Sequence, residues 1–228
     1  MTPQELIRLP PREAIRWMRE RGIVPPDIYS ALPGEYRQLS FSVAGVAALD
    51  QLQAVLDSLT EAAASGETFS TWRRRVEADE IALTLPRHRL DNIFRTNMQG
   101  AYMRGVYERQ HEVQAQRPYL MYDAINDSRT RPAHRAMDNH IAPADDAIWA
   151  THRPPLGYRC RCTLTSLTEQ QARDRGYQGL PAPNVQPDAG WAYDKAAGIG
   201  EGVRQSVQRA IQKSHPRLAA AVPANIAR

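Results

Sequence analysis

Scarce metal-binding side chains gather in one stretch of this sequence. Both cysteines and three of the six histidines lie between His134 and Cys162. Cys160 and Cys162 are two apart in a segment that predicts a strand at 160–164, so both thiols should point to the same face. His134 and His152 supply imidazoles from the N-terminal side. Two sulfurs and two imidazoles form a closed tetrahedral set, which is the usual arrangement of a structural zinc site.

The spacing of these residues leaves their chemistry open. Common zinc fingers place the two ligands of a pair two to four residues apart, whereas His134 and His152 are far apart, with His140 between them as a spare ligand. The cysteines can equally be ordinary buried thiols, and His134 can serve only to cap a short helix. A disulfide is disfavoured, because Cα atoms two apart on a strand lie about 6.6–6.8 Å from each other, near the limit for a bridge.

The composition is that of a folded protein without a membrane span. The chain has 228 residues, 42% of them hydrophobic, enough for one large domain or two small ones. No run of 18 apolar residues occurs and the first residues lack an apolar signal core, so we expect a protein made in the cytosol. The net charge is only +4, and no arginine cluster is dense enough to predict a nucleic-acid surface.

Apolar residues at three- and four-residue spacing predict that the first half of the chain is helical. The clearest helix is expected at 45–64, ended by Ser65-Gly66. Other helices are expected at 11–21, 69–79 and 87–114, and the proline-interrupted segment 23–44 is expected to be loop with a helical turn.

The pattern changes after Arg117-Pro118. YLMYDAI at 119–125 predicts a strand, CRCTL at 160–164 predicts a second one, and Ser166 with Glu169 forms a capping-box pattern that opens a short helix. We therefore predict an α+β protein in three parts: a helical region at 1–116, a small α+β module at 117–198, and a C-terminal arm at 199–228 with a helix at 200–213.

Two sets of polar residues favour structural over catalytic explanations. Arg95 and Asn97 are expected to hydrogen-bond the adjoining α+β module rather than to bind an anion. Asp145-Asp146, in a proline-flanked loop, is expected to be a solvated turn rather than a hydrolytic metal pair.

The residues around His134 and the loop tryptophans are interpreted in the same way. Asp127 or Ser128 could cap the short helix that carries His134, and Arg129 is expected to pair with Asp123 or Asp127. Trp149 and Trp191 are expected to anchor their loops on a core, with an interface role as the alternative.

Several blocks of residues, in order along residues 10–198, together carry a family resemblance. They are RTNMQGAY (95–102), DSRTRPAHRAMDNH, DDAIWATHRPPLGYRCRC and PDAGWAYDKAAG. These blocks resemble the phage Mu F-like head-morphogenesis proteins, which are minor capsid proteins of tailed phages and prophages. In relatives, the positions of Arg131 and His134 often carry a Cys-x-x-Cys pair. This chain also differs at Asp194-Lys195-Ala196, where an Asn-Pro-Gly is commoner.

The resemblance implies a structural role and no established enzymatic activity. It implies a virion protein in the phage head, present in a few copies, bound near the portal vertex and acting in head morphogenesis and DNA ejection. The partners implied are the portal protein, the major capsid protein and packaged DNA. The cysteine-rich variants in the family also favour a structural zinc held by His134, His152, Cys160 and Cys162.

Two other functional classes remain as alternatives. A zinc-dependent nuclease or toxin-like enzyme would use His134, His140, His152 and Asp145-Asp146, and its zinc would keep an open position for water. A DNA-binding module would bind in a strongly salt-dependent way, and the low net charge argues against it.

Overall fold

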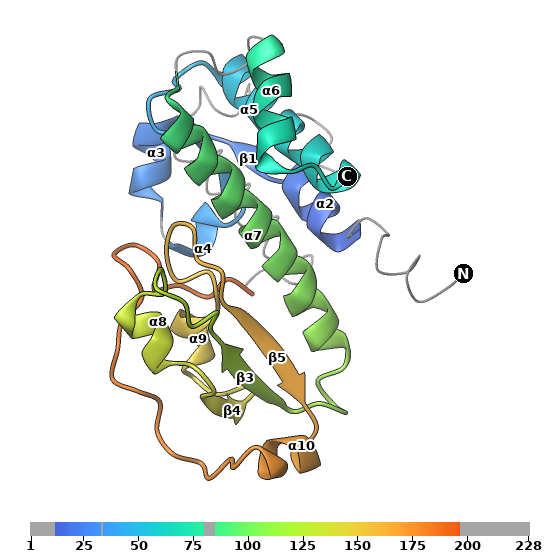
Figure 1. Ribbon diagram of the computed structural model, residues 1–228, viewed down its shortest axis with the longest axis vertical. Coiled ribbons are helices and arrows are strands. Elements are labelled where there is room, and N and C mark those ends of the chain that lie inside the picture. Colours follow the sequence, from blue (N-terminus) through green and yellow to red (C-terminus); the bar gives the residue numbers. More distant parts are fainter. Residues whose placement is uncertain (1–11, 33, 80–84, 197–228) are drawn as a thin grey trace, which may run out of the picture. The chain divides into compact units, whose positions relative to one another are not determined.

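The computed structural model describes residues 12–32, 34–79 and 85–196 (Figure 1). These residues form two compact units, one ending at Tyr102 and the other beginning at Met103. The division lies inside the long helix α7 (Arg87–Glu112), upstream of the predicted boundary after residue 116. The predicted C-terminal arm, with its helix at 200–213, lies outside the described residues. No helix within the described ranges is long and apolar enough to cross a membrane.

The first unit is built from helices and one small pair of strands. Its elements are α2 (Arg12–Arg19), β1 (Gly22–Ile23), α3 (Pro26–Ala31), α4 (Gly34–Arg37), β2 (Ser40–Phe41), α5 (Leu49–Ser65), α6 (Phe69–Ala78) and the first part of α7. The segment 23–44 thus contains two short helices and a strand of a parallel two-stranded sheet, where we expected a loop with one helical turn. Each of these elements is too short to produce a recognisable period in the sequence.

The core of this unit is formed by the apolar faces of its helices. Its largest fully buried side chains are Trp72, Phe41, Met18, Leu52, Leu56, Leu59 and Leu90. Helix α5 ends as predicted, because Gly66 adopts the left-handed conformation that closes a helix, with φ of 69°. Its predicted start at residue 45 was too early, since Gly45 lies in a turn with φ of 81°.

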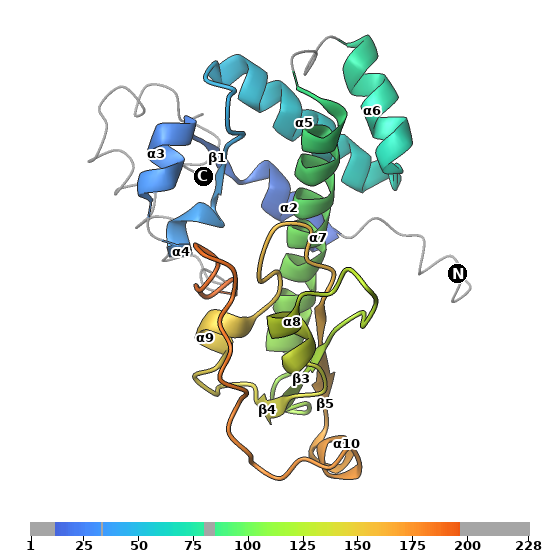
Figure 2. The same ribbon diagram turned by 60° about the vertical axis from the view of Figure 1, so that its left-hand side comes forward.

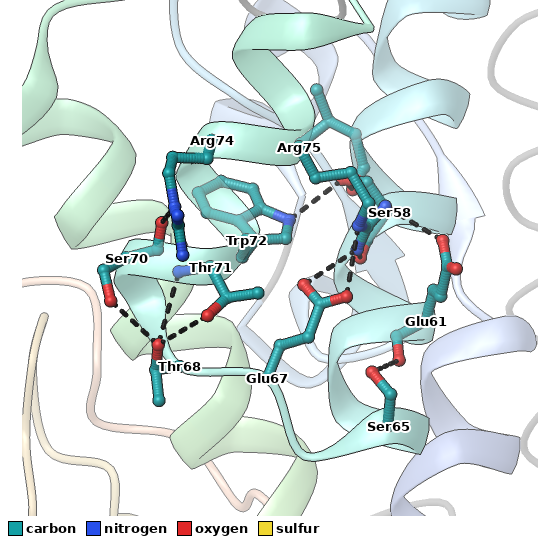
Figure 3. Close-up of polar contacts among 11 residues, drawn as sticks. Ser58, Glu61, Ser65, Glu67, Thr68, Ser70, Thr71, Trp72, Arg74 and Arg75 are labelled. Carbon is teal, nitrogen blue, oxygen red and sulfur yellow. Dashed lines mark hydrogen bonds and ion pairs between the residues drawn. The ribbon is translucent and has the colours of Figure 1, made fainter.

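Polar contacts fasten α6 to α5 (Figure 3). The Thr68 hydroxyl caps α6 by accepting a hydrogen bond from a backbone amide of its first turn. The Arg75 guanidinium donates to both carboxylate oxygens of Glu67, at 3.1 Å each, and to the Ser58 carbonyl at 2.9 Å. The Trp72 indole donates to the Ser58 hydroxyl at 3.2 Å, so this buried ring has its polar atom satisfied.

A buried arginine ties the two-stranded sheet to α7 within the first unit. Arg21 donates two hydrogen bonds to the Ser40 carbonyl, at 2.6 and 3.0 Å, and one to the Asn97 side-chain oxygen at 2.7 Å. Arg95 pairs with Asp91 at 2.7 Å. Arg95 and Asn97 therefore find partners inside the helical unit. Our expectation that these two residues hydrogen-bond the α+β module is corrected.

The second unit places short helices around a three-stranded sheet (Figures 1 and 2). Its elements are the last part of α7, β3 (Tyr119–Asp123), α8 (Pro132–Ala136), β4 (Ile141–Pro143), α9 (Trp149–His152), β5 (Thr163–Leu167) and α10 (Glu169–Asp174). The sheet is antiparallel with the order β4-β3-β5, and Tyr122 on β3 faces Leu164 on β5. The predicted α+β class is confirmed.

Two boundaries near the cysteines differ from the prediction. The second strand runs from Thr163 to Leu167 rather than over 160–164, so Cys160 and Cys162 lie in the lead-in to β5, the short segment that directly precedes this strand. The capping box is formed by Thr168 and Gln171, not by Ser166 and Glu169. Residue 166 is unavailable as a cap because it is paired with β3 inside the strand.

Side chains from the end of α7 and the loop after it cover the outer edge of β5. The Gln110 amide donates to the Leu164 carbonyl at 2.8 Å. The Arg117 guanidinium donates to the Ser166 carbonyl at 2.6 and 3.1 Å. These carbonyls point away from β3, so the side chains satisfy acceptors that the sheet itself leaves without a strand partner.

The last described segment is held down by a buried lysine. The Lys195 ammonium donates to the Trp191 carbonyl and, at 3.3 Å, to the Thr151 carbonyl, and it lies 4.5 Å from the centre of the Tyr193 ring. Burial lowers the pKa of Lys195 to about 7.

Candidate metal centre

Three of the four predicted ligands meet in the interior of the second unit. The Nδ1 atom of His134 lies 3.6 Å from the sulfur of Cys160 and 3.6 Å from the sulfur of Cys162. All three ligand atoms lie within 4.8 Å of one another. The side chains are 2–3% exposed, and neither cysteine is in a disulfide. The sequence prediction that both thiols point to the same face therefore holds, although they precede the strand.

This geometry fits a tetrahedral metal ion. With zinc–sulfur bonds of about 2.3 Å and zinc–nitrogen bonds of about 2.0 Å, the sulfur–nitrogen edge of a tetrahedron is about 3.5 Å long. The two observed Nδ1–Sγ distances of 3.6 Å match this edge. Thiolate and imidazole are also the ligands that zinc prefers. The cluster of His134, Cys160 and Cys162, called the His-Cys-Cys cluster below, could therefore hold one metal ion.

Local backbone features aim the three ligands at one point. Pro132 stands in the first turn of α8, where its missing N–H costs nothing, and the helix presents His134 two residues later. Arg159 adopts the left-handed conformation, with φ of 57°, directly before Cys160. Arginine rarely takes this conformation, so the turn that leads into the cysteines is strained.

An ion pair clips the loop before α8 to the cysteine segment. The Arg161 guanidinium donates to both oxygens of Asp127, at 2.6 and 2.8 Å. These bonds hold the pKa of Asp127 well below its usual range. Asp127 also pairs with Arg129, as one of our two alternatives proposed. It does not cap α8, whose N-cap is Arg131 and has no side-chain cap.

The two thiols of the cluster differ in acidity because they interact with each other. A hydrogen bond from Cys162 is the main reason that the pKa of Cys160 falls to about 7, and the nearby charge of Arg131 adds to the effect. The same interaction, together with burial, raises the pKa of Cys162. The pair therefore releases its first proton easily, as a metal-binding site must.

Arg131 makes polar contacts with two segments beside the cluster. Its guanidinium donates to the Tyr158 carbonyl at 2.7 Å and pairs with Asp188 at 3.3 Å. The Asp188 carboxylate packs against Gly157, where a Cβ would lie 2.1 Å from one of its oxygens. Arg131 thus fastens the loop that follows residue 185 to the turn before Cys160.

His152, the predicted fourth ligand, is not brought into the cluster. It is buried on α9, with Nδ1 2.8 Å from the Thr151 hydroxyl and Nε2 3.0 Å from the Val185 carbonyl. Both ring nitrogens therefore have other partners. The spare ligand, His140, packs near Trp149, with 6.1 Å between ring centres, and burial lowers its pKa.

The residues of the alternative enzymatic site are also dispersed. Asp145 and Asp146 are exposed, and Asp146 accepts a hydrogen bond from the Ile148 amide at 2.9 Å, which is a solvated turn as predicted. Trp149 is buried and donates its indole N–H to the Pro143 carbonyl at 2.8 Å, so it anchors its loop. Within the described part of the chain, the His-Cys-Cys cluster is the one group of three or more such ligands close enough to share a metal.

Sequence reasoning did not find one residue beside the cluster. Tyr122 on β3 is fully buried, and its hydroxyl has no hydrogen-bond partner, as is also true of Nε2 of His134. Both Cys160 and Cys162 act on the pKa of this phenol, which burial raises. The only available signal was a tyrosine inside an otherwise apolar strand.

The match to known proteins covers the region just described. Residues 53–165, from α5 to β5, match the family model for Phage Mu protein F like proteins. This region includes His134, Cys160 and Cys162 and the sheet that supports them. The chain belongs to the phage Mu F-like family.

Two curated relatives support this assignment. The chain is 30% identical over 197 residues to the "Putative capsid assembly protein F" of Escherichia phage Mu, and this alignment covers 75% of the chain and 43% of the relative. It is 44% identical over 98 residues to the Mu-like prophage FluMu F protein of Haemophilus influenzae, covering 43% of the chain and 23% of the relative. The chain thus spans less than half the length of either relative. No solved structure matches it.

Proposed function

We propose that this protein is a structural minor head protein that acts in the assembly of a phage or prophage head and is located in the virion. The observation that carries the proposal is the alignment with a protein named for capsid assembly over three quarters of the chain. We propose no enzymatic activity. The buried His-Cys-Cys cluster supports this, because substrate has no access to ligands that are 2–3% exposed.

The cluster is proposed to hold one structural zinc ion. His134, Cys160 and Cys162 supply three ligands, and His152 keeps its hydrogen bonds to Thr151 and Val185. Bound zinc supplies no chemistry here other than a crosslink between α8 and the lead-in to β5, and its binding energy becomes folding energy.

Elemental analysis tests the zinc proposal. Protein purified without chelator should contain about one zinc per chain, and Cys160→Ser should release the metal and lower the melting temperature. His152→Gln is the matched variant and should retain zinc. Less than half an equivalent in the wild-type protein would contradict the proposal, and loss of zinc in His152→Gln would make His152 a ligand after all.

We propose the portal protein as the principal partner, with the major capsid protein and packaged DNA as further contacts near the portal vertex. The family relation supports a head partner, and the candidate contacts are the helical region at 1–116 and the C-terminal arm at 199–228. Co-purification of portal with the full chain and with a chain truncated at Gly198 tests this. A truncated chain that stays folded but no longer binds portal supports the arm as the contact. A folded truncation that still binds portal contradicts it.

The competing enzymatic function is tested separately. The purified chain, incubated with plasmid DNA with and without divalent metal, should leave the DNA intact. Cleavage that disappears in Asp145→Ala or His140→Ala would replace the structural proposal by a metal-dependent nuclease.

A further inference from the structure

One buried hydroxyl beside the His-Cys-Cys cluster lacks a partner. Tyr122 is 0% exposed, and its hydroxyl makes no hydrogen bond of ordinary geometry with any protein atom. A buried polar atom without a partner lowers stability and is rare in native proteins, so it calls for an explanation. A phenylalanine would fill the same space on β3 without this cost.

The position of Tyr122 indicates which group it serves. It stands on β3 directly across from Leu164, two residues after Cys162. Among the causes that raise the pKa of the phenol, interactions with Cys160 and Cys162 come directly after burial. The hydroxyl is therefore directed at the sulfur side of the cluster.

Binding of a metal would make the sulfur beside this hydroxyl a better hydrogen-bond acceptor. An uncharged thiol is a weak hydrogen-bond acceptor, and here both thiols also interact with Nδ1 of His134. A metal-bound thiolate carries negative charge and is a much better acceptor. A donor placed beside the thiolate then stabilises the loaded centre, as the surrounding hydrogen bonds of metal sites generally do.

We propose that Tyr122 is a positioning residue of the metal centre, whose hydroxyl donates a hydrogen bond to the Cys162 thiolate when zinc is bound. The inference rests on the proposed zinc function. By this inference, the Tyr122 hydroxyl lowers the stability of the metal-free protein and raises the stability of the zinc-loaded protein. Removing the hydroxyl should therefore change the stability of the metal-free and zinc-loaded forms in opposite directions.

The test is Tyr122→Phe in the full chain, with melting temperature measured for metal-free and zinc-loaded protein. The variant should raise the melting temperature of the metal-free form, because an unpaired hydroxyl is gone, and lower that of the loaded form. Competition with a chromophoric chelator should show zinc binding weakened by about 10- to 100-fold. A residue with a purely packing role would shift both forms in the same direction.

Tyr107→Phe is the matched control. Tyr107 is also a buried tyrosine of the second unit, but its hydroxyl already donates to the Pro154 carbonyl. Its loss should lower the melting temperature of both forms alike. This comparison distinguishes the loss of a hydroxyl that is hydrogen-bonded in both forms from the loss of one that is hydrogen-bonded only when zinc is bound.

The possible failures are distinguishable. If wild-type protein binds no zinc, the metal proposal fails and this inference fails with it. If wild type and Tyr122→Phe bind zinc equally, the zinc centre stands and only the role of Tyr122 is overturned. If the visible absorption bands of the cobalt-substituted protein change in Tyr122→Phe as for the loss of an oxygen ligand, Tyr122 binds the metal directly, and the hydrogen-bond assignment is wrong.

Discussion

Arg161 stands between the two cysteines but points to a different partner. Because Cys160 and Cys162 turn toward His134, the residue between them faces the other way, where it meets the Asp127 carboxylate. This ion pair brings the loop that precedes α8 to the cysteine segment. It therefore helps to set the distance between the imidazole and the thiols without touching the metal ligands.

Asp127→Asn should weaken zinc binding while the chain stays folded. An amide can accept one hydrogen bond from Arg161 but loses the charge, so His134 is held less firmly, and we expect a loss of affinity within about 10-fold, the lower end for groups that support metal ligands. Chelator competition measures it. The control is Glu169→Gln, which removes an exposed carboxylate paired with Arg173 at 2.6 Å. An equal loss in both variants would show a general charge effect instead.

The buried Lys195 should make stability depend on pH. Its pKa is lowered to about 7 in the folded chain, whereas the unfolded chain keeps the proton up to about 10.5. Between these values the unfolded state binds more protons, so this contribution to stability is present at high pH and is lost as pH falls through 7. Between pH 7 and about 10.5, the free energy of unfolding of wild type, relative to Lys195→Met, should rise by at most about 1.4 kcal/mol per pH unit. A flat difference would contradict a lowered pKa.

The ligand residues illustrate what a sequence discloses at this scale. His134, Cys160 and Cys162 were predictable, because they are scarce residue types in a segment with little core of its own. The position of His152 was not, since it depends on how α9 packs and on a carbonyl of Val185, far along the chain. Tyr122 was hidden because nothing in a strand pattern reveals an unpaired hydroxyl.

At the scale of elements, the hairpin of α5 and α6 depends on Arg75. Besides Glu67 and the Ser58 carbonyl, its guanidinium contacts Glu61 at 2.9 Å. Arg75→Gln should lower the free energy of unfolding by about 1 kcal/mol, since the network is only partly exposed to solvent. The adjacent variant Arg74→Gln should have almost no effect in the same denaturant titrations, because Arg74 makes a single exposed contact at 3.4 Å. Equal effects of the two substitutions would mean that the change in stability comes from helix propensity and not from the polar network of Arg75.

Long elements were predictable and short ones were not. Helices α5, α6 and α7 each extend over several turns, so their apolar faces repeat often enough to be recognised. The capping pattern at Ser166 failed because a second pattern, Thr168 with Gln171, stands two residues on, and only strand pairing decides between them. The short helices of segment 23–44 owe their form to tertiary contacts such as those of Arg21.

At the scale of the whole molecule, the proposed zinc should stabilise one unit selectively. Its ligands all belong to the unit that begins at Met103. Removing the metal with a strong chelator should increase hydrogen exchange in α8 and β5, which the metal joins. Peptides from α5 and α6 should keep their protection and serve as the internal control. Exchange that rises equally in both units would place the effect of the metal outside the His-Cys-Cys cluster.

The covered edge of β5 limits how two copies of this protein can associate through their sheets. A bare edge strand is a template on which a second polypeptide can add its own strand, and repeated addition leads to aggregation. Gln110 and Arg117 already occupy the acceptors that such an addition would use on β5. A strand from a second molecule therefore cannot add at β5, and growth of fibres by continuation of this sheet is blocked on that side.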